Sequence, residues 1–127
     1  MHPLHVLVVD DDEFIRRWLR RLFADVAFVY LAADASEART ALKEFHFDAV
    51  LSDFAMPGED GLSLLRHVAA VAPESRRVLF SADVPAGASD AVALGQVSAV
   101  LEKPARGERV RAAVVDPLLA LGAAANG

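Results

Sequence analysis

The amino-acid sequence predicts a single α/β domain in which short parallel strands alternate with helices. Along the chain, short apolar runs alternate with longer segments whose apolar residues recur at helical spacing, which is the pattern of repeated strand–helix units. The 127 residues, 54% of them hydrophobic and 24% charged, suffice for one core. The chain has no cysteine, which excludes a disulfide-stapled scaffold. We expect one domain over residues 1–121, a frayed tail over residues 122–127 and no output domain.

Five apolar runs are the predicted strands. They are short and almost entirely apolar, as expected for a parallel sheet that helices cover on both faces. The runs comprise residues 5–9, 27–31, 49–52, 78–80 and 99–101. Because parallel strands are joined by right-handed crossovers, all five should end at the same edge of the sheet.

The segment after the first strand predicts an amphipathic helix. Its apolar residues recur at steps of three or four and are Ile15, Trp18, Leu19 and Leu22. Its opposite side carries the four arginines Arg16, Arg17, Arg20 and Arg21. We expect the apolar stripe to face the sheet and the arginines to face solvent.

Three further segments predict the next helices. One helix is expected to begin near Ser36 and another near Gly61, since each position precedes apolar residues at helical spacing. Pro85 and Gly87 disfavour a long helix within residues 83–94. The helix there should therefore be short and mobile.

A last helix should follow Pro104 and begin near Glu108. Pro117 should kink or end this helix, because its ring removes a hydrogen-bond donor and crowds the preceding turn. The residues beyond it form the tail that we expect to fray.

Charge and hydropathy exclude several classes of function. The net charge of −5 argues against a direct nucleic-acid binder, because binding of duplex DNA requires a concentrated basic face. No apolar run approaches the roughly 20 residues of a membrane span, and no basic leader precedes one. We therefore expect a cytoplasmic protein that does not bind membranes.

Polar residues follow four of the five predicted strands. Asp10, Asp11 and Asp12 follow the first strand, Asp53 the third, Ser81 the fourth and Lys103 the fifth. Because open α/β sheets bind ligands along the edge where the strands end, these side chains should share one site. Asp12 is expected only to cap the first helix.

The chemistry of these residues favours a magnesium site for phosphoryl transfer. Neighbouring carboxylates resist simultaneous ionisation unless a cation neutralises them, and oxygen ligands without histidine or cysteine indicate Mg²⁺. Lys103 is placed to hold Asp53 and an anion beside it, to which Ser81 can donate a hydrogen bond. Phosphoryl transfer requires such positioning and charge neutralisation, with Asp53 as the nucleophile.

A set of short motifs in this order resembles a known family. The motifs are Val8-Val9-Asp10-Asp11, Ser52-Asp53, Met56-Pro57-Gly58, Asp60-Gly61, Ser81-Ala82 and Lys103-Pro104. Together they resemble the receiver domains of bacterial two-component response regulators, and the resemblance covers nearly the whole chain. It implies a flavodoxin-like fold of five strand–helix units whose parallel strands lie in the order 2-1-3-4-5.

The resemblance also implies how the acidic residues act. Asp53 would accept a phosphoryl group from a phosphohistidine of a histidine kinase or histidine phosphotransfer protein. Asp11 and Asp53 would bind Mg²⁺, Asp10 would act mainly through a water, and the backbone carbonyl of Ala55 would complete the metal shell. The domain would catalyse only its own phosphorylation and dephosphorylation, without a separate substrate.

The same resemblance implies a switch. Lys103 would bind the phosphoryl oxygens, and the hydroxyl of Ser81 would move toward the acyl phosphate and draw the following loop with it. The face around the fourth helix, fifth strand and fifth helix would then change. Two residues of that face depart from the family: Val100 replaces a frequent aromatic residue whose rotamer reports phosphorylation, and Ala105 replaces a large apolar one.

Two alternative functions and the role of one surface stay open at this point. A pseudo-receiver would keep the fold without using phosphate, as the missing aromatic at Val100 favours slightly. An Mg²⁺-dependent aspartyl phosphohydrolase would usually have a second acid at the position of Ala55. The four arginines of the first helix are either a solvated surface or a docking face for an acidic helix of the kinase or phosphotransfer protein.

Overall fold

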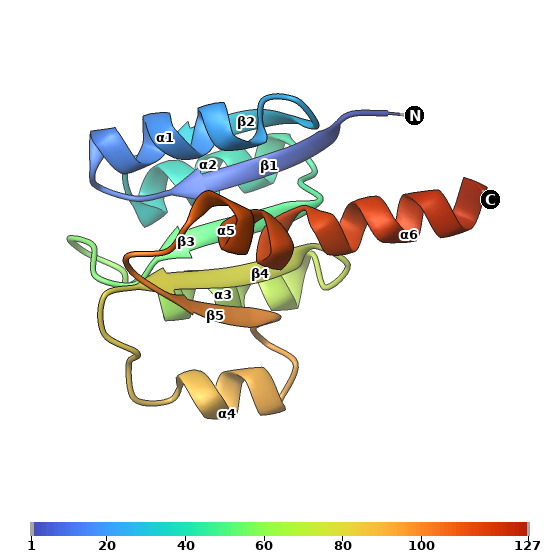
Figure 1. The fold of residues 1–127 in the computed structure, drawn as a ribbon. Helices are drawn as coiled ribbons and strands as arrows, with labels where there is room; N and C mark the ends of the chain where they lie inside the picture. The colour runs from blue at the N-terminus through green and yellow to red at the C-terminus, as the bar shows by residue number, and fades with distance from the viewer. Residues whose placement is uncertain (1, 127) are drawn as a thin grey trace.

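The computed structural model describes residues 2–126 as a five-stranded parallel sheet between two layers of helices (Figure 1). The strands are β1 (Leu4–Val9), β2 (Ala27–Ala32), β3 (Ala49–Asp53), β4 (Arg76–Ser81) and β5 (Ala99–Glu102). The helices are α1 (Glu13–Phe23), α2 (Ala35–Glu44), α3 (Gly61–Val71), α4 (Ala88–Ala93), α5 (Gly107–Val114) and α6 (Asp116–Asn126). The strand order is β2-β1-β3-β4-β5, so the predicted fold class is confirmed.

Three strands extend further toward the site than predicted. β3 includes Asp53, β4 includes Ser81 and β5 includes Glu102, because parallel pairing continues through these polar residues. Asp53 pairs with Phe80, and Ser81 pairs with Glu102. The apolar runs therefore end one residue before the strands do, because the last residue of each of these strands is polar.

The core consists of two apolar layers, one on each face of the sheet. Successive residues of β1 point to opposite faces, as in any strand. Leu7 and Val9 pack with residues of α2, α3 and α4. Val6 and Val8 pack with residues of α1 and α5. All four β1 side chains are almost fully buried, so the central strand is covered on both sides as predicted.

Helix α1 buries the stripe that the sequence predicted. Leu19 is buried, and Ile15, Trp18 and Leu22 pack against the same core layer. The side chain of Asp12 accepts a hydrogen bond from the backbone N–H of Phe14 at 2.9 Å and so caps the helix. The expected capping role of Asp12 agrees with this geometry.

Helices α2 and α3 begin within one residue of their predicted starts, each behind an aspartate cap. The side chain of Asp34 accepts from the N–H of Glu37, and that of Asp60 accepts from the N–H of Ser63, both at 2.8 Å. These caps satisfy backbone donors that have no partner within the helix. The cap at Asp60 also fixes the end of the loop that follows Asp53.

Helix α4 is short, as predicted. It spans Ala88–Ala93 and begins after Gly87, which has a φ of 89° and offers no side-chain cap. Its buried residues have small side chains, whereas Val92 and Leu94 are exposed. Its mobility stays a prediction.

The end of the chain differs from expectation. α5 ends at Val114, shortly before Pro117, as predicted, but a separate helix that was not predicted, α6, follows and has Pro117 in its first turn. Proline is well tolerated there because that turn's N–H groups have no helical partner. α6 extends to Asn126, and Gly127 lies outside the described residues. That the tail over residues 122–127 frays stays a prediction. Like the other helices within residues 2–126, α6 lacks the length and hydropathy to cross a bilayer.

Candidate functional site

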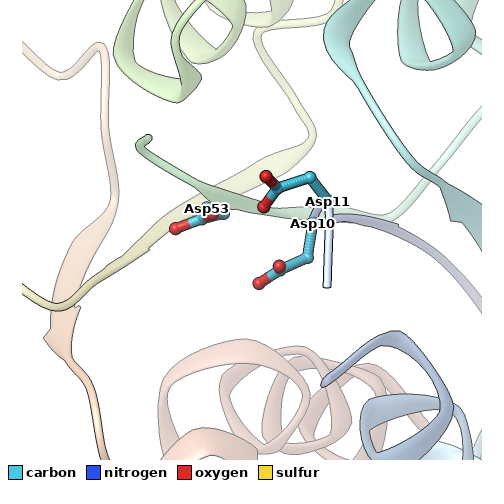
Figure 2. A group of neighbouring side chains, drawn as sticks. All are labelled: Asp10, Asp11 and Asp53. Carbon is cyan, nitrogen blue, oxygen red and sulfur yellow. The ribbon is translucent and has the colours of Figure 1, made fainter. Parts of the chain in front are cut away.

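Three carboxylates meet at the edge of the sheet where the strands end. Val9 pairs with Ser52, so the next residues along these neighbouring strands, Asp10 and Asp53, lie side by side. Asp10, Asp11 and Asp53 each place an oxygen within 4.8 Å of the others (Figure 2). Asp10 and Asp53 are buried, and Asp11 is exposed. The structure thus brings together the acidic residues that the sequence predicted.

Lys103 reaches this cluster from the fifth strand. Its Nζ lies 2.8 Å from Oδ2 of Asp10 and 3.2 Å from Oδ1 of Asp53. Since β4 separates β5 from β3, the long side chain passes over the end of β4, with Nζ 5.2 Å from the ring centroid of Phe80. Sequence reasoning anticipated the contact with Asp53 but not the shorter contact with Asp10.

The electrostatics of the cluster favour a bound cation. Burial, followed by the charge of Asp10, raises the pKa of Asp53, although Lys103 opposes this shift. Burial would lower the pKa of Lys103, but its hydrogen bonds and charge interactions with Asp10 and Asp53 outweigh burial and raise that pKa. One ammonium group faces three carboxylates, so negative charge remains that a hard divalent cation would neutralise.

Ser81 is the last residue of β4, is buried, and lines the same hollow as Asp53. Its hydroxyl donates to the backbone carbonyl of Asp83. A serine hydroxyl has one proton to donate, so it must leave this carbonyl before it can donate to another oxygen. Ser81, Asp53 and Lys103 line a hollow of about 390 Å³ together with residues of the two adjoining loops.

Gly61 packs directly against the backbone of Asp53. The N–H of Gly61 donates to the carbonyl of Phe54 at 2.9 Å, which brings the start of α3 against the end of β3. A Cβ at Gly61 would lie 1.9 Å from the carbonyl oxygen of Asp53. Only glycine permits this approach. The motif Asp60-Gly61 was visible in the sequence, but this steric requirement was not.

The loop after Asp53 is also tied to α2. Arg39 donates two hydrogen bonds, both of 2.7 Å, to the carboxylate of Glu59. Glu59 also accepts from the hydroxyl of Ser63. The hydrogen bonds from Arg39, opposed by partial burial and supported by Ser63, lower the pKa of Glu59 to about 2. Sequence reasoning missed this pair because its members are 20 residues apart.

Replacing Glu59 with glutamine should lower the free energy of unfolding by about 1 kcal/mol at pH 7, a modest value because both side chains retain some solvent contact. The folded-state pKa lies below the ordinary value of 4.5, so this stabilisation is complete above pH 4.5 and disappears as the pH falls toward 2. Urea unfolding of wild type and Glu59→Gln from pH 7 to pH 3 measures it. A gap that stays constant over this range would contradict the assignment. The control Glu13→Gln, in an exposed pair with Arg17, should change stability by less than about 0.5 kcal/mol.

The two departures from the family pattern lie in one place. Val100 and Ala105 both line a hollow of about 600 Å³ between α4 and the start of α5. Small side chains at both positions leave this space open. The sequence predicted a changed surface here, but the hollow itself becomes visible only in the structure.

The four arginines of α1 are not equivalent. Arg17, Arg20 and Arg21 are exposed, and Arg17 pairs with Glu13 at 2.7 Å. Arg16 is half-buried and donates a hydrogen bond of 2.7 Å to the backbone carbonyl of Asp10. One of the four predicted docking residues is therefore engaged with the acidic site.

The protein is thus a doubly wound α/β domain with an acidic site at the edge of the sheet where the strands end, and one lysine, Lys103, pairs with the acids of this site. A family model described as "Response regulator receiver domain" matches residues 6–115. The chain belongs to this family of two-component signalling domains.

Known relatives and solved structures agree with this membership. The chain is 36% identical over 113 residues to the transcriptional regulatory protein FixJ of Bradyrhizobium diazoefficiens, covering 87% of this chain and 54% of the relative. It is 39% identical over 70 residues to the chemotaxis protein CheY of Pseudomonas aeruginosa, covering 53% of this chain and 56% of the relative. A signal receiver domain of an HD domain-containing protein from Pseudomonas fluorescens Pf-5 superposes with a TM-score of 0.81 and 26% identity, over 88% of this chain and 91% of that one. The chain spans about half or less of the length of these curated relatives and of the first others it matches.

Proposed function

We propose that this chain is a phosphoacceptor, in which Asp53 takes a phosphoryl group from a phosphohistidine of a histidine kinase or histidine phosphotransfer protein. The observation that carries the proposal is that Asp53 lies beside the carboxylates of Asp10 and Asp11 and contacts the ammonium group of Lys103. A buried acid with like charges beside it and one opposing amine is typical of a functional site.

The site fits a magnesium ion. Asp10, Asp11 and Asp53 form an oxygen-rich cluster without histidine or cysteine. Asp11, Asp53 and the backbone carbonyl of Ala55 would contact the ion directly. When bound, the ion would offset the charge that accumulates on the transferred phosphoryl oxygens. Asp10 would act mainly through a water, since its own carboxylate already accepts from Lys103 and from the N–H of Asp12.

The protein's own groups account for the remaining steps. A carboxylate oxygen of Asp53 forms a bond to phosphorus while the phosphorus–nitrogen bond of the phosphohistidine breaks, and the bonding electron pair leaves with the imidazole. Lys103 then exchanges part of its contact with Asp53 for the new phosphoryl oxygens. The hollow lined by Asp53, Ser81 and Lys103 is where the phosphoryl group would lie.

Ser81 would pass the change on to the surface. Its hydroxyl would exchange the carbonyl of Asp83 for a phosphoryl oxygen and so release the loop before α4. That loop leads to the face formed by α4, β5 and α5, which contains the hollow at Val100. Signalling without an aromatic residue at this position would depend on the loop and α4.

We also propose how the domain meets other molecules. The exposed arginines Arg17, Arg20 and Arg21 would dock an acidic helix of the kinase or phosphotransfer protein, while Arg16 serves the site itself. The domain would act in the cytoplasm and would turn over no separate substrate. Two relatives are methylesterases by name, but the matches cover only 24% and 30% of their lengths. A downstream effector would read the change at the face formed by α4, β5 and α5.

Intact-mass measurement after incubation with acetyl phosphate and Mg²⁺ tests the proposal. We expect a labile adduct with the mass of one phosphoryl group, absent without Mg²⁺ and absent in Asp53→Asn. The exposed acid Asp90, changed to asparagine, is the matched control and should still form the adduct. No adduct with any phosphodonor would instead identify a pseudo-receiver, and continuous release of phosphate from many esters a phosphohydrolase.

A further inference from the structure

We infer that Arg16 is a positioning residue of the acidic site, which holds the turn carrying Asp10 and Asp11 in the shape that binds the metal. The inference rests on the proposed function and adds a residue to it. It separates Arg16 from the three exposed arginines of the same helix.

The contacts of Asp10 carry this inference. Its backbone carbonyl accepts from a terminal nitrogen of Arg16 at 2.7 Å. Its carboxylate accepts from the N–H of Asp12 at 2.9 Å and from Lys103 at 2.8 Å. Each oxygen of Asp10 thus has its own donor: Asp12 and Lys103 each donate to one carboxylate oxygen, and Arg16 donates to the backbone carbonyl oxygen. Within residues 2–126 the carbonyl of Asp10 has no backbone donor.

The position of this carbonyl explains why the bond affects the site. Asp10 is the first residue after β1: its backbone N–H still donates to the carbonyl of Ala32 in β2 at 3.1 Å, but its own carbonyl lies beyond this pairing, where the chain turns into α1. A carbonyl in such a turn is free to rotate unless a donor holds it, and the rotation would move the side chains on both sides. Arg16 lies one helical turn beyond the cap Asp12, so its side chain reaches back over the turn to this oxygen.

If only charge mattered, removing Arg16 would strengthen Mg²⁺ binding, whereas loss of its hydrogen bond to Asp10 should weaken it. A guanidinium group close to three carboxylates reduces the attraction of the site for a cation, so its loss would strengthen metal binding. Arg16 is half-exposed, however, and solvent screens its charge, whereas the hydrogen bond to Asp10 is direct. We therefore expect geometry to outweigh charge.

Three variants separate these effects. Arg16→Met removes both the hydrogen bond and the charge. Arg16→Lys retains the charge but loses the planar group that reaches the carbonyl. Arg106→Met is the matched control, because it removes an exposed arginine whose side chain caps nothing and to which no role at the site or the docking face is assigned. Mg²⁺ affinity is measured from the rise of the urea midpoint with Mg²⁺ concentration, which depends on the dissociation constant and not on the stability of the metal-free chain.

Arg16→Met should raise the Mg²⁺ dissociation constant about tenfold, as for other residues that orient metal ligands. Arg16→Lys should lie between this variant and wild type, and Arg106→Met should remain within about twofold of wild type. Phosphorylation by acetyl phosphate at subsaturating Mg²⁺ should slow in the same order, since this donor needs no docking surface.

Two results would overturn the inference. An unchanged dissociation constant in Arg16→Met, with only a lower metal-free midpoint, would indicate a purely structural role. A lower dissociation constant would indicate that charge outweighs geometry. If Arg16→Met does not fold, the same comparison holds for Arg16→Lys against Arg106→Met. A wild-type chain that Mg²⁺ does not stabilise would overturn the proposed function itself, which is a separate outcome.

Discussion

Replacing Gly61 with alanine is expected to lower the free energy of unfolding by about 3 kcal/mol, which is large for one methyl group. The new Cβ would lie 1.9 Å from the carbonyl oxygen of Asp53 and 2.8 Å from its carbonyl carbon. Both atoms belong to the backbone of β3, which pairs on each side with a neighbouring strand and so cannot retreat. The start of α3 must therefore move away, and the hydrogen bond from Gly61 to Phe54 would break.

Phosphorylation should fail in the same variant, because the displaced backbone includes Asp53 and adjoins the carbonyl of Ala55. Urea unfolding measures the stability, and intact mass after incubation with acetyl phosphate measures the adduct. Gly122→Ala is the matched control, since Gly122 lies within α6 with no atom near the added methyl group. It should gain roughly 0.5–1 kcal/mol and form the adduct normally. A Gly61→Ala chain as stable as wild type would show that α3 can shift without cost.

Lys103→Met should lower the free energy of unfolding by about 3 kcal/mol in metal-free buffer. The substitution keeps most of the length of the side chain and removes its charge. It leaves the carboxylates of Asp10, 2% exposed, and Asp53, 8% exposed, without their cationic partner. An uncompensated buried charge is among the most destabilising changes that a single substitution can produce. Saturating Mg²⁺ should restore part of the loss, because it would supply the missing positive charge.

The chain provides a matched control for this experiment, because Lys43 is its only other lysine. Lys43 is exposed in the last turn of α2, and Lys43→Met should change stability by no more than about 0.5 kcal/mol with or without Mg²⁺. Urea unfolding of wild type and of the two variants, each in chelator and in excess Mg²⁺, gives the six values needed. Equal stability of both variants in chelator would contradict the pairing of Lys103 with the acids.

The general layout of the site followed from the sequence because it depends on topology. Once the strands are known to be parallel, the residues that follow them must meet at one edge, and only their chemistry has to be recognised. Asp10, Asp11, Asp53 and Lys103 meet that condition, and the structure brings them together. The strand order came from the resemblance to the family and not from the apolar pattern.

Other features depend on contacts that no local pattern encodes. The bond from Arg16 to Asp10 depends on one side-chain rotamer, and the ion pair of Arg39 with Glu59 joins separate elements. The sequence predicted only that Pro117 would kink or end a helix, because a proline that ends one helix and a proline in the first turn of the next look the same in the sequence. The helix beyond Pro117 was therefore not predicted. The role of each residue was set by its neighbours in space.

The contact between Lys103 and Asp10 joins residues 93 positions apart in the chain. Asp10 comes directly after β1, the first strand of the sheet in chain order, and Lys103 comes directly after β5, the fifth. A nascent polypeptide on the ribosome, or a fragment cleaved upstream of position 103, would already contain the acidic residues but would lack the amine that completes the pocket. The complete site would therefore form only when β5 has joined the sheet, so a partly synthesised domain would hold the acids without the amine that opposes them.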